Sequence, residues 1–272
     1  MLKKLLFTAL VFVVCTNSWA AEMQWFGGAH DRDWFNTANW GPAGGPIPTG
    51  VDKAKLNYVW ANPGPVVSAP GAIANEIFIS EDRDLGTIGE QSLTIAAGGE
   101  LTANGQVILG YFGPDSRAGL PANEGRLIID GGTATLATLG ASHLWVGFGG
   151  IGHLVVNSGL LDIRGNFGIG FNGGSGTVEL NGGVLNTQQF NFNNASDYSF
   201  DITGGEWIEK GFYVAEIEAL VNAGKITGYG GAGEVVVTWD PVLEQTHVTA
   251  VIPEPITITL LGIGALLIRK RS

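Results

Sequence analysis

The stretch LVVNSGLLDIRGNFGIGFNGGSGTVELNGG, residues 154–183, contains one short pattern twice. Each copy is an alternating strand that ends in a branched aliphatic residue, followed by a spacer, a small residue and glycine. The pattern recurs from residue 91 onward, and its aliphatic anchors, spaced 34, 27, 24 and 22 residues apart, are Ile95, Ile129, Val156, Leu180 and Ile202. A period in the low twenties with two or three short strands is typical of one coil of a β-solenoid.

We therefore expect an all-β chain built as a right-handed parallel β-helix. The five anchors should stack into an interior ladder, with glycines at the corners where the backbone needs a positive φ. The largest spacing, 34 residues, is explained by an outward loop at residues 112–124, which is rich in Gly, Pro, Asp and Asn. A β-sandwich of similar strands is the alternative fold.

A second element alternates with the first and places an aromatic residue after a glycine. Its three copies are Leu109-Gly110-Tyr111, Val146-Gly147-Phe148 and Ile169-Gly170-Phe171. The three aromatic rings either form an exposed ladder on which sugar rings stack, or pack into the core or against one another. The sequence leaves this choice open.

Both ends of the repeat region have features of caps, which an open stack of strands requires. The N-terminal part is rich in tryptophan, with Trp25, Trp34, Trp40 and Trp60. Near the other end, residues 213–223 have the apolar spacing of one amphipathic helix, formed by Val214, Ile217, Leu220 and Val221. Gly224 is its expected C-terminal end, and two strands are expected at 234–239 and 247–252.

The composition limits the classes of function. Of 272 residues, 43 are glycine, and 25 acidic residues face 14 basic ones for a net charge of −11. Such an acidic chain repels phosphate backbones, so we expect no nucleic-acid partner. Cys15, the single cysteine, lies in an apolar leader, so the processed chain should contain no disulfide and no thiolate.

The first twenty residues have the three parts of a secretory signal. Lys3 and Lys4 are its positive region, residues 5–15 are apolar, and Ser18-Trp19-Ala20 places small residues before the cleavage point. We expect signal peptidase to cut between Ala20 and Ala21 after export by the Sec machinery.

The C-terminus also has three parts. Pro253-Glu254-Pro255 is followed by thirteen uncharged residues, 256–268, and then by Arg269, Lys270 and Arg271. A helix of thirteen residues rises about 20 Å, and neighbouring residues and local thinning would let it cross a bilayer. The basic cluster would remain on the cytoplasmic side as a membrane stop.

This tail resembles the PEP-CTERM sorting signal of Gram-negative bacteria. The resemblance covers about the last 22 residues and implies recognition near Pro253, Glu254 and Pro255 by an exosortase, a membrane cysteine protease-transpeptidase. It further implies delivery to the cell surface of a bacterium that makes extracellular polysaccharide. The body is similar to the autotransporter-type β-helix repeats of such exported proteins, and residues 34–40 and 48–52 resemble their usual opening.

The sequence thus predicts five parts. They are a signal peptide (1–20), an N-terminal cap (21–90), β-solenoid repeats (91–210), a C-terminal cap (211–252) and a sorting signal (253–272) with a transmembrane-like segment (256–268).

We expect no catalytic, cofactor-binding or metal-binding residues. Residues 147–152 and 168–173 have dinucleotide-type glycine spacing, but a strand rather than a helix should follow each. The glycine-rich stretches at 149–154, 173–178 and 230–235 lack the aspartate of calcium-binding nonapeptides. For a polysaccharide-cleaving enzyme, Asp130, Asp162, Arg126 and Arg164 fall at different places in their coils, and the four histidines are scattered.

The predicted function is therefore non-enzymatic. We expect an exported, exosortase-processed protein with a structural or adhesive role at the cell surface or in the extracellular matrix, after transient insertion in the inner membrane. A carbohydrate-binding surface protein, with extracellular polysaccharide as its partner, is the first alternative. A β-helix polysaccharide lyase or hydrolase is the second.

Overall fold

The computed structural model describes residues 20–41, 44–57, 64–81, 90–112, 122–192 and 197–252. Within these residues nineteen strands form one large, mostly parallel sheet. The strands are β1 (Glu22–Trp25), β2 (Trp40–Gly41), β3 (Lys53–Leu56), β4 (Val66–Val67), β5 (Ala72–Ala74), β6 (Glu76–Ile79), β7 (Glu90–Ala96), β8 (Glu100–Ala103), β9 (Val107–Leu109), β10 (Glu124–Leu136), β11 (His143–Phe148), β12 (Ile151–Phe171), β13 (Ser175–Leu180), β14 (Val184–Phe192), β15 (Tyr198–Ile202), β16 (Glu206–Lys210), β17 (Ile226–Gly228), β18 (Glu234–Asp240) and β19 (Gln245–Val251). The helical segments are η1 (Thr37–Asn39), α1 (Val214–Asn222) and η3 (Tyr229–Gly231).

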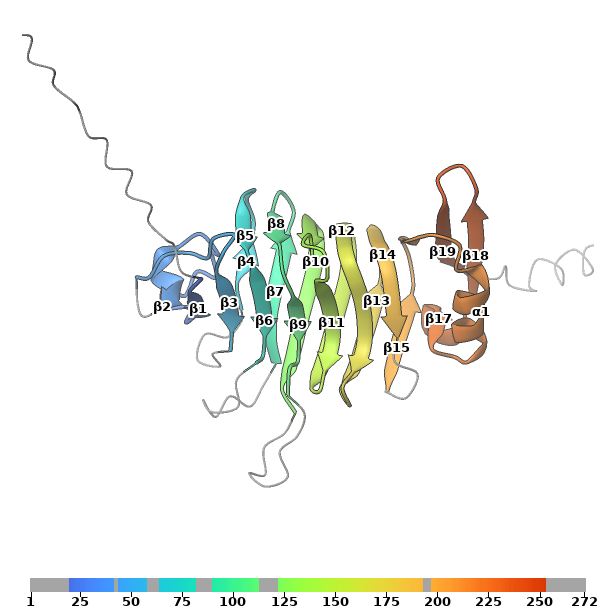
Figure 1. The fold of residues 1–272 in the computed structure, drawn as a ribbon, viewed down its shortest axis with the longest axis horizontal. Helices are drawn as coiled ribbons and strands as arrows, with labels where there is room; N and C mark the ends of the chain where they lie inside the picture. The colour runs from blue at the N-terminus through green and yellow to red at the C-terminus, as the bar shows by residue number, and fades with distance from the viewer. Residues whose placement is uncertain are drawn as a thin grey trace, which may run out of the picture.

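The parallel strands pair in three stacks, and each stack runs along the long axis of the molecule (Figure 1). Stack A consists of β4, β7, the first part of β10, the first part of β12, β13, β15 and β17. Stack B consists of β5, β8, the second part of β10, the middle of β12, the first part of β14, and β16. Stack C consists of β1, β3, β6, β9, β11, the end of β12 and the end of β14.

The predicted register of the five anchors is confirmed. In stack A, Ile95 pairs with Ile129, Ile129 with Val156, Val156 with Leu180, and Leu180 with Ile202. All five side chains are fully buried in one hydrophobic core. Alternation places every second residue of a strand on the same face, so equal spacing from the corner keeps aliphatic residues stacked on one another.

Glycine forms the corner between stacks A and B. Gly159 and Gly183 have φ values of +88° and +72°, which non-glycine residues rarely adopt. A Cβ on Gly183 would lie 2.5 Å from the carbonyl oxygen of Gly159 in the preceding pass of the chain. Both backbone conformation and close approach therefore require glycine, as the repeat pattern predicts.

The N-terminal end is closed by tryptophan packing. Trp25, Trp34 and Trp40 are fully buried. The rings meet edge-on, with centroids 5.2 Å apart for Trp25–Trp40 and 4.8 Å apart for Trp34–Trp40. The Trp40 indole donates a hydrogen bond to the carbonyl oxygen of Trp34 at 2.8 Å. Parallel pairing already begins between β1 and β3, inside the segment expected as a cap. Trp60 lies outside the described residues.

The C-terminal end contains the α-helix and an antiparallel hairpin (Figure 1). The predicted helix is confirmed as α1, with Ile217 buried and Leu220 and Val221 packed against the core. Gly224, with φ +69°, follows its C-cap. The two predicted strands form the hairpin β18–β19, and β19 pairs antiparallel with β16, the last strand of stack B.

Candidate functional site

The outer face of stack C carries an aromatic cluster. In β6, Ile77 and Ile79 point into the main core, whereas Phe78 between them belongs to a separate outer cluster with Ile108 and Trp145. Strand alternation explains this, because Phe78, Ile108 and Trp145 pair in register on the outward-facing row. The next position of that row is Gly168, whose missing Cβ leaves room for Trp145, since a Cβ would lie 2.0 Å from its ring.

Four rings on this face form what we call the outer aromatic ladder: Phe78, Tyr111, Phe148 and Phe171. Successive ring centroids lie 5.7, 5.4 and 5.5 Å apart, with interplanar angles of 14°, 16° and 25°. Trp145 stacks on Phe171 at 4.3 Å. Of the two arrangements that the sequence left open, the rings adopt packing against one another. The faces of these rings are directed at neighbouring rings.

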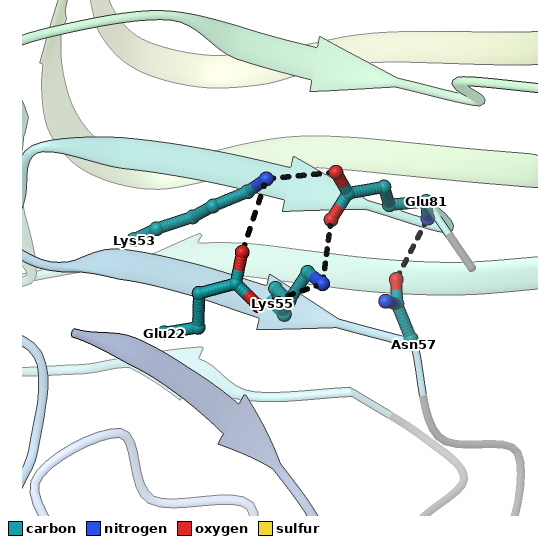
Figure 2. Close-up of polar contacts among 5 residues, drawn as sticks. All are labelled: Glu22, Lys53, Lys55, Asn57 and Glu81. Carbon is teal, nitrogen blue, oxygen red and sulfur yellow. Dashed lines mark hydrogen bonds and ion pairs between the residues drawn. The ribbon is translucent and has the colours of Figure 1, made fainter.

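At one end of the ladder, Lys53 extends over the ring of Phe78, with its Nζ 3.7 Å from the ring centroid. Lys53 also belongs to a four-charge cluster with Glu22, Lys55 and Glu81 (Figure 2). Lys53 Nζ lies 2.7 Å from Glu81 Oε1, and Lys55 Nζ lies 3.0 Å from Glu22 Oε2. Asn57 Oδ1 accepts a hydrogen bond from the backbone nitrogen of Glu81 at 2.7 Å.

The four-charge cluster is electrically balanced. The hydrogen bond from Lys55 and the two lysine charges lower the pKa of Glu22, despite some desolvation. Desolvation disfavours the charged form of Lys55, but its contacts with Glu22 and Glu81 outweigh that cost and raise the pKa of Lys55. Lys55 is therefore held as an ammonium group, which suits an ion-pair link between β1, β3 and the end of β6 and not a nucleophile.

One carboxyl group is buried in the core. Glu209 in β16 is fully buried, and burial raises its pKa to about 7, although a hydrogen bond from Thr187 opposes the shift. The Thr187 hydroxyl donates to Glu209 Oε2 and accepts from the Trp207 indole nitrogen at 2.6 Å. Glu209 Oε1 has no hydrogen-bond partner among the described residues. Because Glu209 is fully buried, a dissolved substrate cannot reach its carboxyl group.

Other acid–base contacts lie on the outer surface. His153 Nε2 lies 2.8 Å from Glu124 Oε1, and His247 Nδ1 lies 2.8 Å from Glu206 Oε1. Of the residues considered for polysaccharide cleavage, Arg164 pairs with Asp162 at 2.9 Å on one strand, while Asp130 is exposed at a corner. In the part of the chain that the structure describes, no group of three His, Cys, Asp or Glu side chains could hold a metal ion.

The glycine-rich motifs lie at corners that lead into strands. The segment 147–152 runs into β12, and the segment 168–173 contains the end of β12 and leads into β13, so the expected strand, and not a helix, follows each segment.

Two hollows flank α1. One, of about 440 Å³, lies between the end of β14 and the helix and is lined by Phe190, Asn191, Phe192, Tyr213, Glu216, Ala219 and Leu220. The other, of about 490 Å³, lies between the helix and β17–β18 and includes Glu218, Val221 and Glu234 in its lining. The first combines aromatic rings with an amide and a carboxylate, a mixture of apolar and polar groups found in small-molecule pockets.

The predicted processing residues fall at the edges of the described chain. Ala20 is exposed, and the backbone nitrogen of Ala21 donates a hydrogen bond to Asp52 Oδ1 at 2.9 Å. Pro253, Glu254, Pro255, the segment 256–268 and Arg269, Lys270 and Arg271 lie outside the described residues. Among the helices described, none is long and apolar enough to cross a membrane.

Sequence reasoning missed Asp52, Glu209 and the four-charge cluster. The alternation Lys53-Ala54-Lys55-Leu56 could have indicated an outward pair of lysines. Glu209 follows Trp207 at the inward spacing of two, which could have placed it in the core.

Comparison with protein-family models, with curated proteins and with solved structures finds no match to this chain.

Proposed function

We propose that this chain is an exported right-handed parallel β-helix with a non-enzymatic, structural role at the cell surface or in the extracellular matrix. In this proposal signal peptidase removes residues 1–20, and an exosortase recognises Pro253-Glu254-Pro255 and removes the tail. The processed protein contributes a rigid rod to a polysaccharide-containing matrix.

The observation that carries the proposal is the continuity of the three parallel stacks. In stack A the aliphatic column runs from Val67 through the five anchors, all fully buried. Parallel in-register pairing favours a β-helix over a β-sandwich, whose sheets are antiparallel. Each pass of the chain buries its inward side chains only against the neighbouring passes, so most of the residues serve to lengthen the stack.

The polar chemistry of the described residues supports a non-enzymatic role. The most perturbed carboxyl group, Glu209, is sealed in the core, and the two lysines of the four-charge cluster are neutralised by glutamates. Catalytic groups need a perturbed pKa together with access for a substrate, and Glu209 lacks that access.

Mass spectrometry of protein purified from the surface and medium of its native host tests the processing. We expect a C-terminus at or near residues 253–255. Glu254→Ala should keep the tail to Ser272 and remain with the inner membrane. Glu218→Ala, which removes an exposed acid from α1, is the matched control and should be processed normally. Wild-type surface material that ends at Ser272 would refute the sorting role.

Incubation of the purified protein with the extracellular polysaccharide of the host tests the non-enzymatic role. We expect no release of reducing sugar. Release by the wild-type protein would favour the hydrolase or lyase alternative and overturn this part of the proposal.

Carbohydrate binding is the second candidate function, and the hollow beside β14 favours it. Phe190 and Tyr213 supply aromatic rings there, and Asn191 and Glu216 supply polar groups. Binding of host polysaccharide that is lost in Tyr213→Ala but retained in Tyr111→Ala would support this function at the hollow and not at the outer aromatic ladder.

A further inference from the structure

The side chain of Asp52 lies at the N-terminal end of the fold, where β1 joins β3. Asp52 is 5% exposed, and its Oδ2 accepts hydrogen bonds from the backbone nitrogen of Thr49, at 3.0 Å, and from the Thr49 hydroxyl. Its Oδ1 accepts from the backbone nitrogen of Ala21 at 2.9 Å. Among the described residues, no lysine, arginine or histidine forms an ion pair with this carboxylate.

The position of Ala21 is fixed independently of Asp52. Its carbonyl oxygen accepts a hydrogen bond from the backbone nitrogen of Lys53 at 2.8 Å, and Glu22 pairs with Lys53 in the parallel register of β1 and β3. Ala20, by contrast, is exposed. The peptide bond expected to be cut by signal peptidase therefore joins an exposed residue to one held against a buried carboxylate.

Resting on the export in the proposed function, we propose that Asp52 is the binding site for the α-ammonium group that cleavage creates on Ala21. Hydrolysis of the Ala20–Ala21 peptide bond adds the hydroxyl of water to the Ala20 carbonyl and a hydrogen to the Ala21 nitrogen. The amine then takes a proton from solvent. A hydrogen bond from a neutral amide to the Asp52 carboxylate thereby becomes an ion pair between an ammonium and that carboxylate.

The surroundings of the two groups favour this ion pair. The carboxylate is already desolvated and oriented by Thr49, so the ammonium completes its coordination without further rearrangement. One ammonium hydrogen points to Asp52 Oδ1, and the others can be hydrated where the exposed Ala20 has been removed. The ammonium adds the Coulomb attraction of a full positive charge to a hydrogen bond that the carboxylate already accepts, and this pair keeps part of the solvation of the cation.

The consequence is that processing strengthens the attachment of the N-terminal end. β1 is the first strand of stack C and carries Trp25, which packs on Trp40. The ion pair between Ala21 and Asp52 adds to the β1–β3 pairing that holds β1 and its tryptophan over the end of the sheet. A sheet end that is open invites pairing with another chain, so the closure suits a protein that becomes exposed only after export.

The test measures the acylation rate of the Ala21 α-amine as a function of pH. Processed protein is purified from the native host and treated with an acetylating N-hydroxysuccinimide ester, and mass spectrometry quantifies the N-terminal peptide. An α-amine normally has a pKa of about 8. We expect a pKa at least about one pH unit higher in the folded protein, and acetylation at neutral pH about tenfold slower than in the same protein unfolded in guanidinium chloride.

Two variants make the assignment specific. Asp52→Asn should restore an ordinary amine pKa and fast acetylation. Glu22→Gln removes a neighbouring carboxylate that makes no contact with the Ala21 nitrogen and should keep the slow acetylation. If Asp52→Asn does not fold, the comparison of folded and unfolded wild-type protein decides alone.

The outcomes separate this inference from the proposed function. An Ala21 N-terminus with an ordinary pKa, or a mature N-terminus at another residue, overturns the Asp52 site while leaving export and tail removal intact. A raised pKa at Ala21 in a protein with an uncut tail supports the Asp52 site and refutes exosortase processing.

Discussion

The replacement Glu209→Gln should make the protein more stable at neutral and alkaline pH. Glu209 is fully buried next to Thr187 and Trp207, and its Oε1 has no hydrogen-bond partner among the described residues. Ionisation places an unpaired negative charge in this core, whereas glutamine keeps the shape of the side chain and cannot ionise. The gain comes from the removal of that charge.

The magnitude follows from the pKa of Glu209, which burial raises from 4.5 to about 7. Because the folded pKa lies above the unfolded one, the free energy of unfolding is highest below pH 4.5 and falls as the pH rises through 7. At about 1.4 kcal/mol per pH unit, the full loss is about 3 kcal/mol. In Glu209→Gln this loss disappears, while an amide hydrogen without an acceptor costs about 1 kcal/mol at every pH.

Urea unfolding at pH 5 and pH 8, followed by tryptophan fluorescence, measures both the pH-dependent cost of ionising Glu209 and the pH-independent cost of the unpaired amide hydrogen in Glu209→Gln. The wild-type protein should lose about 2–3 kcal/mol between the two pH values, and the variant should lose much less of it. Glu179→Gln, on an exposed position of β13, is the control and should follow the wild-type protein. Parallel pH profiles for the wild-type protein and Glu209→Gln would mean that water reaches the carboxylate and that the core around it is not closed.

Three further perturbations test the packing. Leu180→Ala, in the middle of the anchor column, should lower the free energy of unfolding by about 2–5 kcal/mol in urea titrations, and a loss below 1 kcal/mol would contradict the interior ladder. Gly168→Ala should displace Trp145 and shift its fluorescence, because the added Cβ would lie 2.0 Å from the ring; an unchanged spectrum contradicts this contact. Glu81→Gln leaves two half-buried lysines with one carboxylate and should destabilise by about 1–3 kcal/mol, less in high salt, and a salt-independent result would argue against an ionic origin.

The interior of the fold was predictable because it repeats. Ile129, Val156 and Leu180 each precede a corner glycine by two or three residues, so their stacking follows from period and alternation. Helix α1 was predictable for a similar reason, since its apolar spacing needs no partner to be recognised.

The outer aromatic ladder was only half predictable. The sequence placed Tyr111, Phe148 and Phe171 at equivalent positions, but it did not decide between exposure and mutual packing. Neighbouring parallel strands lie about 4.8 Å apart, close to the separation at which rings stack, so equivalent aromatics in successive passes satisfy one another. Trp145 adds to this only because Gly168 opens space beside it, a complementarity between residues that no repeat pattern contains.

The polar groups that the sequence did not reveal, Asp52, Glu209 and the four-charge cluster, lie toward the ends of the stacks. In the middle, each pass has a neighbour on both sides, so identical aliphatic columns are sufficient. The first and last passes lack a parallel neighbour on one side, so different side chains are needed there. In stack B the paired inward residues Leu136 and Ile163 are followed by Thr187 and then by Glu209. Glu209 lies in β16, which pairs with the antiparallel strand β19. At the opposite end, Asp52 accepts a hydrogen bond from the backbone nitrogen of Ala21. Position-specific chemistry in this protein is therefore expected at its two ends, next to the proposed processing sites, and substitutions there should alter the pH response more than those in the repeats.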